Sequence, residues 1–275
     1  AIEKGVIPGP RLLIATRAIV ATGSYGPANT PDLILPKGAA EADGKEGMTK
    51  EVRTQIGMGA DFIKVYADYR WGLNKEARPT FTEEEIKMAV DVAGSSGRPV
   101  VAHAASAEGM RRAIMAGVST IEHGDGADLE IYRLMKEKGV ALFPTLAAGD
   151  ALLQYRGWNP ARDKEPQRIT EKKASFRKAL ESGVIIGMGG DVGVYAHGDN
   201  AREMILMQDY GMSAINVLRS ATSVNANILG VKDKVGSVQV GLLADLIIVD
   251  EDPSKDIRLV KKVILVMKGG VIFKH

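Results

Sequence analysis

Residues 98–124 read RPVVAHAASAEGMRRAIMAGVSTIEHG, and this stretch indicates the fold more clearly than any other part of the chain. A short apolar run ends at His103, an amphipathic segment follows, Gly117 closes that segment, and a second apolar run ends at His123. The amphipathic segment has helical periodicity, and a glycine after the last residue is a common way to end a helix. A strand, a helix and another strand in this order are typical of a parallel sheet with crossover helices.

The same unit recurs along the chain. A glycine between a helix and the next strand is found in MGADF, SSGRPV, MAGVST, EKGVALF and ESGVII. Apolar runs predict strands in RLLIATRAIV, DFIKVY, RPVVAH, VSTIEH, VALFPT and VIIGMGGD. The helices predicted between them include residues 82–93, 107–116, 129–138 and 170–182. One repeated βα unit therefore predicts an α/β architecture.

The predicted fold is a (β/α)₈ TIM-like barrel over residues 1–230. We count six strands where a closed barrel of this kind has eight. The chain also opens on the end of a helix, so two βα units are expected to precede Ala1. Residues 231–275 instead alternate apolar and polar residues between tight turns, which predicts antiparallel strands. So small a sheet is expected to be the C-terminal segment of a composite β-sandwich, completed by an N-terminal stretch.

Composition narrows the classes of function. With 45% hydrophobic and 25% charged residues, the chain has the make-up of a globular protein. Its net charge is only +2, and basic and acidic residues are interspersed along the chain. Neither a nucleic acid nor a membrane surface is therefore expected as a partner. A small molecule is the expected partner, with a homo-oligomer as an open alternative. The absence of cysteine excludes a disulfide framework and thiolate zinc ligands, and we expect a cytoplasmic location.

Four predicted strands end in a residue that can bind a metal ion, namely Lys64, His103, His123 and Asp191. In a barrel of parallel strands these ends meet at one face, where active sites of this fold lie. Each residue alone has an ordinary structural explanation: a satisfied core or loop histidine, an aspartate that caps a helix, or a solvated lysine. Their convergence on one face predicts a metal site.

Six stretches of the sequence carry a resemblance to a known family. They are IPGPRLLIAT, GADFIKVY, VVAHAASAEGMRRAIMAGVSTIEHG, GMGGDVGVYAHGDNAREM, SATSVNANILG and GSVQVGLLADLIIVDEDP. Together they cover nearly the whole chain. The chain resembles the amidohydrolase superfamily, especially the branch that contains Xaa-Pro dipeptidases, lysine and arginine carboxypeptidases and imidazolonepropionase-like hydrolases.

The resemblance implies a site with two divalent metal ions, commonly zinc, bridged by a carboxylated lysine and a hydroxide. Lys64 matches that lysine, and its carboxylate would derive from carbon dioxide. A buried lysine beside cations loses its proton readily, and the neutral amine can then react with carbon dioxide. His103 and His123 match the two histidines of the second metal. Asp191 matches the aspartate that binds the first metal and transfers protons.

The chain departs from the family pattern in two places and lacks one element. The family's His-x-His pair lies at the end of the first barrel strand, and nothing before Lys64 supplies it. Ala105 stands where relatives often carry a tyrosine or histidine that faces the substrate. Tyr25, in TGSYG, stands where relatives often carry the histidine of a TGGHG-like segment. These departures bear on the choice of substrate.

Three residues are candidates for contact with the substrate: Tyr25, Tyr66 and His197. His197 has an alternative role in bracing its own loop beside Asp199. The function predicted is metal-dependent hydrolysis of an amide bond in a dipeptide or an N-acyl amino acid, with Asp191 as the acid and base. One alternative keeps the chemistry and changes the substrate to a cyclic amide. A second alternative is a barrel that no longer catalyses and serves as an assembly partner.

Overall fold

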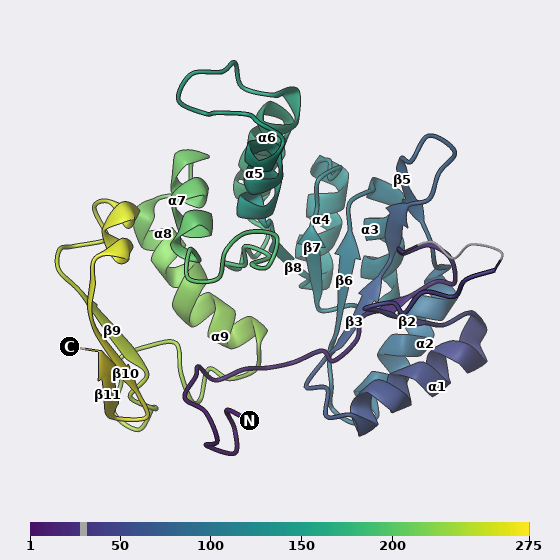
Figure 1. The fold of residues 1–275 in the computed structure, drawn as a ribbon, viewed down its shortest axis with the longest axis horizontal. Coiled ribbons are helices and arrows are strands. Elements are labelled where there is room, and N and C mark those ends of the chain that lie inside the picture. Colours follow the sequence, from purple (N-terminus) through teal and green to yellow (C-terminus); the bar gives the residue numbers. More distant parts are fainter. Residues whose placement is uncertain (28–31, 275) are drawn as a thin grey trace. The chain divides into compact units, whose positions relative to one another are not determined.

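The computed structural model describes residues 1–27 and 32–274 (Figure 1). The chain forms two compact units, residues 1–140 and residues 141–275, and each is described by itself. The two units are separated by how densely their residues contact one another. They do not test the predicted boundary between the barrel and the C-terminal segment at residue 230, which stays a prediction. No helix in the described residues is long and apolar enough to cross a bilayer.

The first unit is built on a parallel sheet. Its strands lie in the order β2-β1-β3-β6-β7. Their bounds are Ile19–Val20 (β1), Ala40–Glu41 (β2), Ile63–Tyr66 (β3), Val100–Ala104 (β6) and Thr120–His123 (β7). The register pairs Tyr66 with His103 and Ala104 with His123. The carboxyl ends of the three longest strands therefore lie level at one edge of the sheet.

Four helices belong to this unit: α1 (Gly44–Gly57), α2 (Glu83–Gly94), α3 (Ala107–Ala116) and α4 (Leu129–Lys138). Three of them begin at side chains that cap the free backbone N–H groups, Thr82 for α2, Ser106 for α3 and Asp128 for α4. Gly117 and Gly139 end α3 and α4 in the left-handed conformation. The helices predicted from the sequence are confirmed here, whereas α1 was not predicted.

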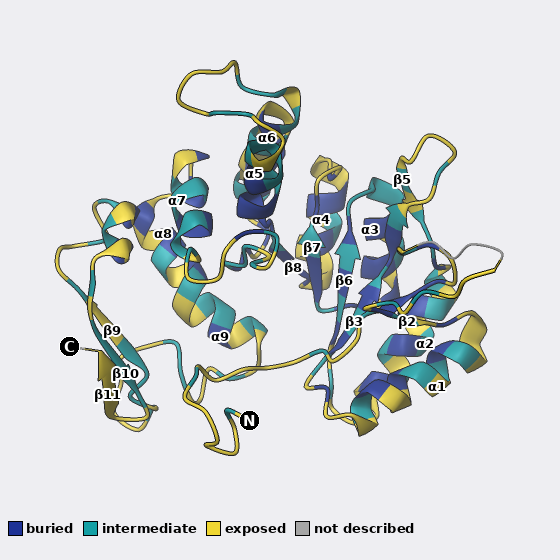
Figure 2. Ribbon diagram, viewed as in Figure 1, coloured by how far each residue is buried: buried dark blue, intermediate teal, exposed yellow. Residues whose placement is uncertain are grey.

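Alternation along the strands sorts side chains between the two faces of the sheet. In β3, Ile63 and Val65 are fully buried, while Lys64 and Tyr66 are partly exposed. In β6, Ala102 is buried and His103 is partly exposed. Because successive side chains in a strand point to opposite faces, Lys64, Tyr66 and His103 share a face. Figure 2 shows buried residues along the strands and on the helices that cover them.

An antiparallel hairpin, β4 (Asp68–Arg70) with β5 (Ala77–Pro79), follows β3 and was not predicted. The strand predicted over residues 11–20 is reduced to Ile19–Val20. Residues just before it follow another path, because Thr16 has a positive φ of 58° and the backbone N–H of Arg17 donates to the side chain of Gln55. A sheet ladder cannot include a residue in that conformation.

The second unit begins with a strand and is largely helical. Its elements are β8 (Ala141–Phe143), α5 (Leu146–Tyr155), α6 (Gln167–Ser182), α7 (Ala201–Asp209), α8 (Ala214–Arg219), a π-helical turn (Ser220–Val224), α9 (Asn225–Ile228) and a 3₁₀ turn (Ile257–Lys261). The helix predicted over residues 170–182 is part of α6. The helix that ends near Leu229 is interrupted by the π turn.

The strand predicted in VIIGMGGD is present only as one parallel bridge, between Leu142 and Ile186. Two side chains form hydrogen bonds with the backbone of this segment before Asp191. The hydroxyl of Ser220 donates to the carbonyl of Ile186 at 2.8 Å. Asn225 accepts from the N–H of Met188 at 3.1 Å and donates to its carbonyl at 2.8 Å. An amide side chain thus satisfies backbone groups that a neighbouring strand would otherwise bond.

The antiparallel strands predicted in residues 231–275 are confirmed. Strands β9 (Leu246–Val249), β10 (Val263–Lys268) and β11 (Val271–Lys274) form a sheet in the order β11-β10-β9. Strand β11 is exposed along its whole length, and Val271, Ile272 and Phe273 are each about half exposed.

Candidate active site

Two imidazoles lie side by side at the carboxyl edge of the first unit's sheet. His103 is in β6, and His123 is the last residue of β7. Their ring centroids are 4.5 Å apart and the rings are inclined at 69°. Two imidazoles bound to one tetrahedral zinc ion have centroids about 5 Å apart, given Zn–N bonds of about 2 Å. The spacing of His103 and His123 therefore suits a shared ion.

Lys64 lies near these imidazoles, on the strand next to β6. Burial lowers the pKa of His103 to about 4, and the positive charge of Lys64 contributes to that shift. Arg70 lowers this pKa further, while the negative charge of Asp125 opposes the shift. His103 is consequently neutral at pH 7, and a neutral imidazole has a lone pair available for a metal ion.

The residues of the first unit fit part of a metal site. No group of three or more His, Cys, Asp or Glu side chains in the described ranges 1–27 and 32–274 is arranged to hold an ion. The first unit does bring together two imidazoles and one lysine. If Lys64 carries a carboxylate, these three side chains offer the nitrogen and oxygen donors that suit a borderline divalent ion. Asp191, the fourth predicted ligand, belongs to the second unit.

His123 and Asp191 share an unusual backbone conformation. Their φ angles are 76° and 58°, in the left-handed region that residues other than glycine seldom adopt. Thr145, after β8, has a φ of 48°. Such conformations cost on the order of 1–3 kcal/mol each and are concentrated at functional sites. Two of the four predicted ligands therefore sit at strained positions.

The backbone before Asp191 lies against a buried tyrosine. A Cβ atom at Gly190 would lie 2.1 Å from the hydroxyl oxygen of Tyr195, so only glycine fits there without rearrangement. Tyr195 is buried, and this burial raises its pKa to about 12. The guanidinium of Arg202 lies over its ring, 5.7 Å from the centroid, and also forms an ion pair with Asp150.

Glu203 is a buried carboxylate in the same unit. It accepts hydrogen bonds from the backbone N–H groups of Leu146, at 3.0 Å, and Ala147, at 2.7 Å, which open helix α5. Burial raises its pKa to about 7, and the negative charge of Asp191 adds to that rise. Glu203 lies in the first turn of α7, 12 residues after Asp191. Nothing in the sequence indicated that it is buried.

Three tyrosines form a cluster beside His103, and two of them contact its imidazole ring. Tyr66 stacks on the imidazole with centroids 4.4 Å apart. Tyr25 contacts Tyr66 edge-on at 5.3 Å, and Tyr69 lies 5.9 Å from His103 and 5.1 Å from Tyr25. Tyr25 and Tyr66, the tyrosines predicted to contact substrate, are thus beside the histidines. Tyr69 was missed because it lies in the unpredicted hairpin.

His197 is exposed in the loop before α7, in the second unit. Its neighbour Asp199 forms an ion pair with Lys261 at 3.4 Å. A contact of His197 with substrate stays a prediction.

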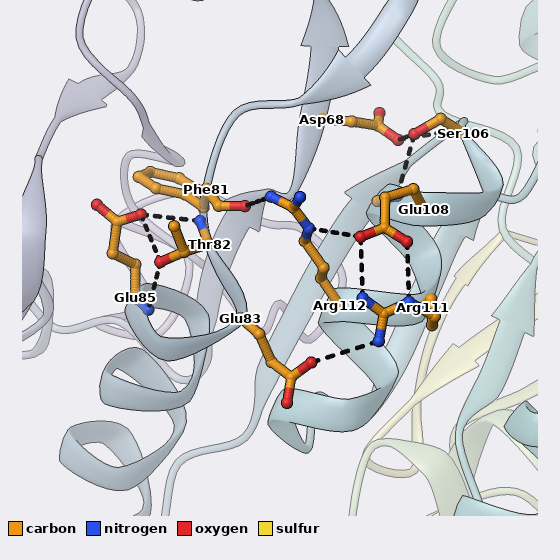
Figure 3. A network of polar contacts seen from close by, with 10 residues as sticks. Asp68, Phe81, Thr82, Glu83, Glu85, Ser106, Glu108, Arg111 and Arg112 are labelled. Carbon is orange, nitrogen blue, oxygen red and sulfur yellow. Dashed lines mark hydrogen bonds and ion pairs between the residues drawn. The ribbon is translucent and has the colours of Figure 1, made fainter.

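A polar network lies at the start of helix α3 (Figure 3). Glu108 accepts from both Arg111 and Arg112, which lowers the pKa of Glu108 to about 2. Arg112 also donates to the carbonyl of Phe81 at 2.9 Å, just before α2. Asp68, from the hairpin, joins the network through Ser106. The beginnings of α2 and α3 are therefore tied together close to the strand that carries His103.

Comparison with known proteins identifies the family of this chain. Residues 1–273 match the amidohydrolase family. The chain belongs to the amidohydrolase family. The ochratoxinase of Aspergillus niger is 30% identical over all of this chain, which spans 62% of that relative's length. The family resemblance found in the sequence is thereby confirmed.

Solved structures of amidohydrolases extend the comparison to the fold. A Xaa-Pro dipeptidase with bound methionine superposes with a TM-score of 0.88 at 34% identity, covering 100% of this chain and 70% of that one. A prolidase complexed with N-methylphosphonate-L-proline gives a TM-score of 0.85 at 30% identity, covering 100% and 72%. The predicted α/β TIM-like fold with a small antiparallel C-terminal sheet is confirmed, and the family supports a hydrolase.

Proposed function

We propose that the protein containing this chain hydrolyses an amide bond in a small substrate, a dipeptide or an N-acyl amino acid, with the help of divalent metal ions. The observation that carries the proposal is that Lys64, His103 and His123 lie on three neighbouring strands of one sheet, with both histidines at its carboxyl edge, Lys64 two residues before the end of β3, and the charge of Lys64 acting on His103. Because the chain spans less than two thirds of the ochratoxinase it matches, the activity of the whole protein is part of the proposal.

His103 and His123 would hold an ion through imidazole nitrogens, and Lys64 would hold it through a carboxylate formed with carbon dioxide. In the whole protein we propose two ions, most simply zinc. The chemistry that a divalent ion would supply in such a site is a lowered pKa for bound water and polarisation of the scissile carbonyl group. Asp191 accepts a proton from the attacking water and passes it to the leaving nitrogen, which completes the acid–base chemistry of amide hydrolysis.

The tyrosines beside His103 form the substrate side of the proposed site. Tyr25, Tyr66 and Tyr69 present flat, partly exposed rings, and a phenol offers both an apolar face and a hydrogen-bonding oxygen. This surface suits a small molecule with an apolar side chain next to the amide. Neither a nucleic acid nor a membrane is part of the proposal, and the cytoplasmic location stays a prediction.

The test measures release of the C-terminal amino acid from a panel of dipeptides and N-acyl amino acids, with added zinc and after chelation. We expect zinc-dependent turnover that is lost in His123→Ala. The variant His197→Ala is the matched control, and it should retain its bound metal. Ring opening of a cyclic amide without dipeptide cleavage would favour an imidazolonepropionase-like hydrolase. Full metal loading without any turnover would instead favour a barrel that serves as an assembly partner.

A further inference from the structure

Asp68 is a fully buried carboxylate next to the proposed metal site, and the function proposed above gives it no role. It is the first residue of the hairpin that follows β3. The hairpin base is fixed at this point: the N–H of Ala67 donates to the carbonyl of His103 at 2.9 Å, and Thr80 donates to the carbonyls of Ala67 and Tyr66. The position of the Asp68 backbone is therefore tied to the strand that carries His103.

The two carboxylate oxygens of Asp68 have different surroundings. Oδ2 accepts from the N–H of Ala105 at 2.9 Å, the N–H of Ser106 at 2.7 Å and the hydroxyl of Ser106 at 2.6 Å. Oδ1 is shared with the N–H of Ala105 at 3.0 Å and faces Nε2 of His103 at 3.8 Å. Oδ2 is occupied by the loop before α3, while Oδ1 retains a lone pair for the imidazole.

Helix α3 leaves room for this carboxylate. A Cβ atom at Gly109 would lie 2.3 Å from Oδ2 of Asp68, a distance that no side chain tolerates. Figure 3 shows Asp68 beside Ser106 at the start of this helix. Glycine is a poorer helix former than alanine, so the close approach of Asp68 gives a physical reason for the glycine at this position.

We propose that Asp68 is a positioning residue that keeps the proton of His103 on Nε2 and so leaves the lone pair of Nδ1 free to bind a metal ion. A carboxylate beside one ring nitrogen favours the tautomer with N–H on that side. Carboxylates that hold metal-binding imidazoles in this way typically change metal affinity about 10–100-fold when they are removed. This role rests on the proposed function, in which His103 is a ligand.

A purely structural Asp68 would only order the loop before α3, and the two roles differ in what they change at His103. The test uses the full chain and the substitution Asp68→Asn, which keeps the shape but places an amide group near Nε2. The first readout is the tautomer of His103 in the metal-free protein at pH 7, from nitrogen NMR chemical shifts. The second is the affinity for zinc, from competition with a chelator.

We expect wild-type His103 to carry its proton on Nε2, and Asp68→Asn to shift the population toward Nδ1–H and weaken zinc binding about 10–100-fold. Ser106→Ala is the matched control, because it removes a hydrogen bond to Asp68 and the cap of α3 without altering the atoms that face His103. It should lower thermal stability and leave the tautomer and zinc affinity unchanged. An unchanged tautomer and zinc affinity in Asp68→Asn would overturn the role of Asp68.

Gly109→Ala is a second variant, for use if Asp68→Asn does not fold. Its new methyl group displaces the Asp68 carboxylate and leaves Asp68 and His103 chemically intact, so we expect the same two shifts in smaller degree. If neither readout moves in a folded Gly109→Ala protein, the proposal fails. A wild-type protein that binds no zinc would contradict the proposed function itself, which separates that failure from a failure of Asp68 alone.

Discussion

The ring of Tyr66 lies flat against the imidazole of His103, with centroids 4.4 Å apart and planes inclined at 14°. The stacking follows from strand register, because Tyr66 and His103 are direct partners in the parallel pairing of β3 and β6. The tyrosine covers one face of the imidazole and contributes to the burial that lowers the pKa of His103 to about 4. A substrate-side residue and a proposed metal ligand are thus coupled through one contact.

The variant Tyr66→Ala should raise the pKa of His103 in the metal-free protein from about 4 toward its ordinary value of 6.5, because water then reaches the imidazole. The pKa can be measured from the pH dependence of the His103 ring signals in NMR spectra. Tyr66→Phe keeps the stacked ring and serves as the control, with little change expected. Equal pKa values in the alanine and phenylalanine variants would show that Tyr66 does not shield the imidazole.

The low pKa of His103 should also affect stability. Between pH about 4 and 6.5 the unfolded chain binds a proton at this position that the folded chain does not. The free energy of unfolding of the metal-free protein should therefore decrease as pH falls through this window, by up to about 3 kcal/mol. Urea unfolding at several pH values measures it, and His103→Gln should flatten that part of the curve. If the free energy of unfolding depends on pH equally in the wild type and in His103→Gln, the low pKa assigned to His103 is wrong.

Strong local patterns made much of the first unit predictable. The strands ending at His103 and His123 and the helix between them follow from apolar periodicity and from Gly117. Helix α1 was missed because GKEGMTKEVRTQIG is polar and contains three glycines, so its few apolar residues give a weak pattern. Its buried residues Met48 and Val52 pack in the tertiary structure, which a local pattern does not reveal.

Parts of the candidate site could not be predicted for a different reason. Asp68 and Tyr69 lie in a three-residue strand, and so short a strand has no periodicity to detect. In the sequence Glu203 resembles an ordinary polar residue of an amphipathic helix. In the structure it is buried, and its carboxylate accepts hydrogen bonds from two backbone N–H groups at the start of α5. These roles depend on contacts between residues far apart in the chain.

Replacement of Lys64 by alanine should reduce the zinc bound per chain and remove amide hydrolysis, because the proposed site loses its only oxygen donor from the first unit. Metal analysis after gel filtration measures the first effect. Short carboxylic acids added to Lys64→Ala should partly restore turnover by supplying the missing carboxylate. Lys50→Ala, at an exposed position of α1, is the matched control. Normal zinc content in Lys64→Ala would mean that the lysine is not a ligand.

Asn225 should be more important for stability than its position on a short helix suggests. Asn225→Ala leaves the N–H and the carbonyl of Met188 without their side-chain partner. We expect the free energy of unfolding to fall by about 1–3 kcal/mol and amide exchange at residues 187–190 to accelerate. Asn227→Ala, on the exposed side of the same helix, should change stability by less than about 0.5 kcal/mol. Similar losses in both variants would argue against this support of the segment.

Glu203 should make the protein less stable as the pH rises from about 4.5 to about 7. Its folded pKa is raised to about 7, so in this window the folded state binds a proton that the unfolded state has released. The free energy of unfolding must then decrease with rising pH, by on the order of 3 kcal/mol over the window, and level off above it. This slope is opposite in sign to the slope that His103 contributes. Comparison of the wild type with His103→Gln isolates the contribution of His103, and comparison with Glu203→Gln isolates that of Glu203.

Glu203→Gln removes the titrating group and should abolish its part of the slope, although the variant also loses one of the two acceptors for the N–H groups of Leu146 and Ala147 and should be less stable below pH 5. The slope of stability against pH, rather than its absolute value, is therefore the quantity to compare. Glu181→Gln, at an exposed position near the end of α6, is the matched control and should leave the slope unchanged. If wild type and Glu203→Gln lose stability equally between pH 4.5 and 7, Glu203 is ionised throughout. The two backbone donors at the start of α5 would then outweigh the cost of burying its charge.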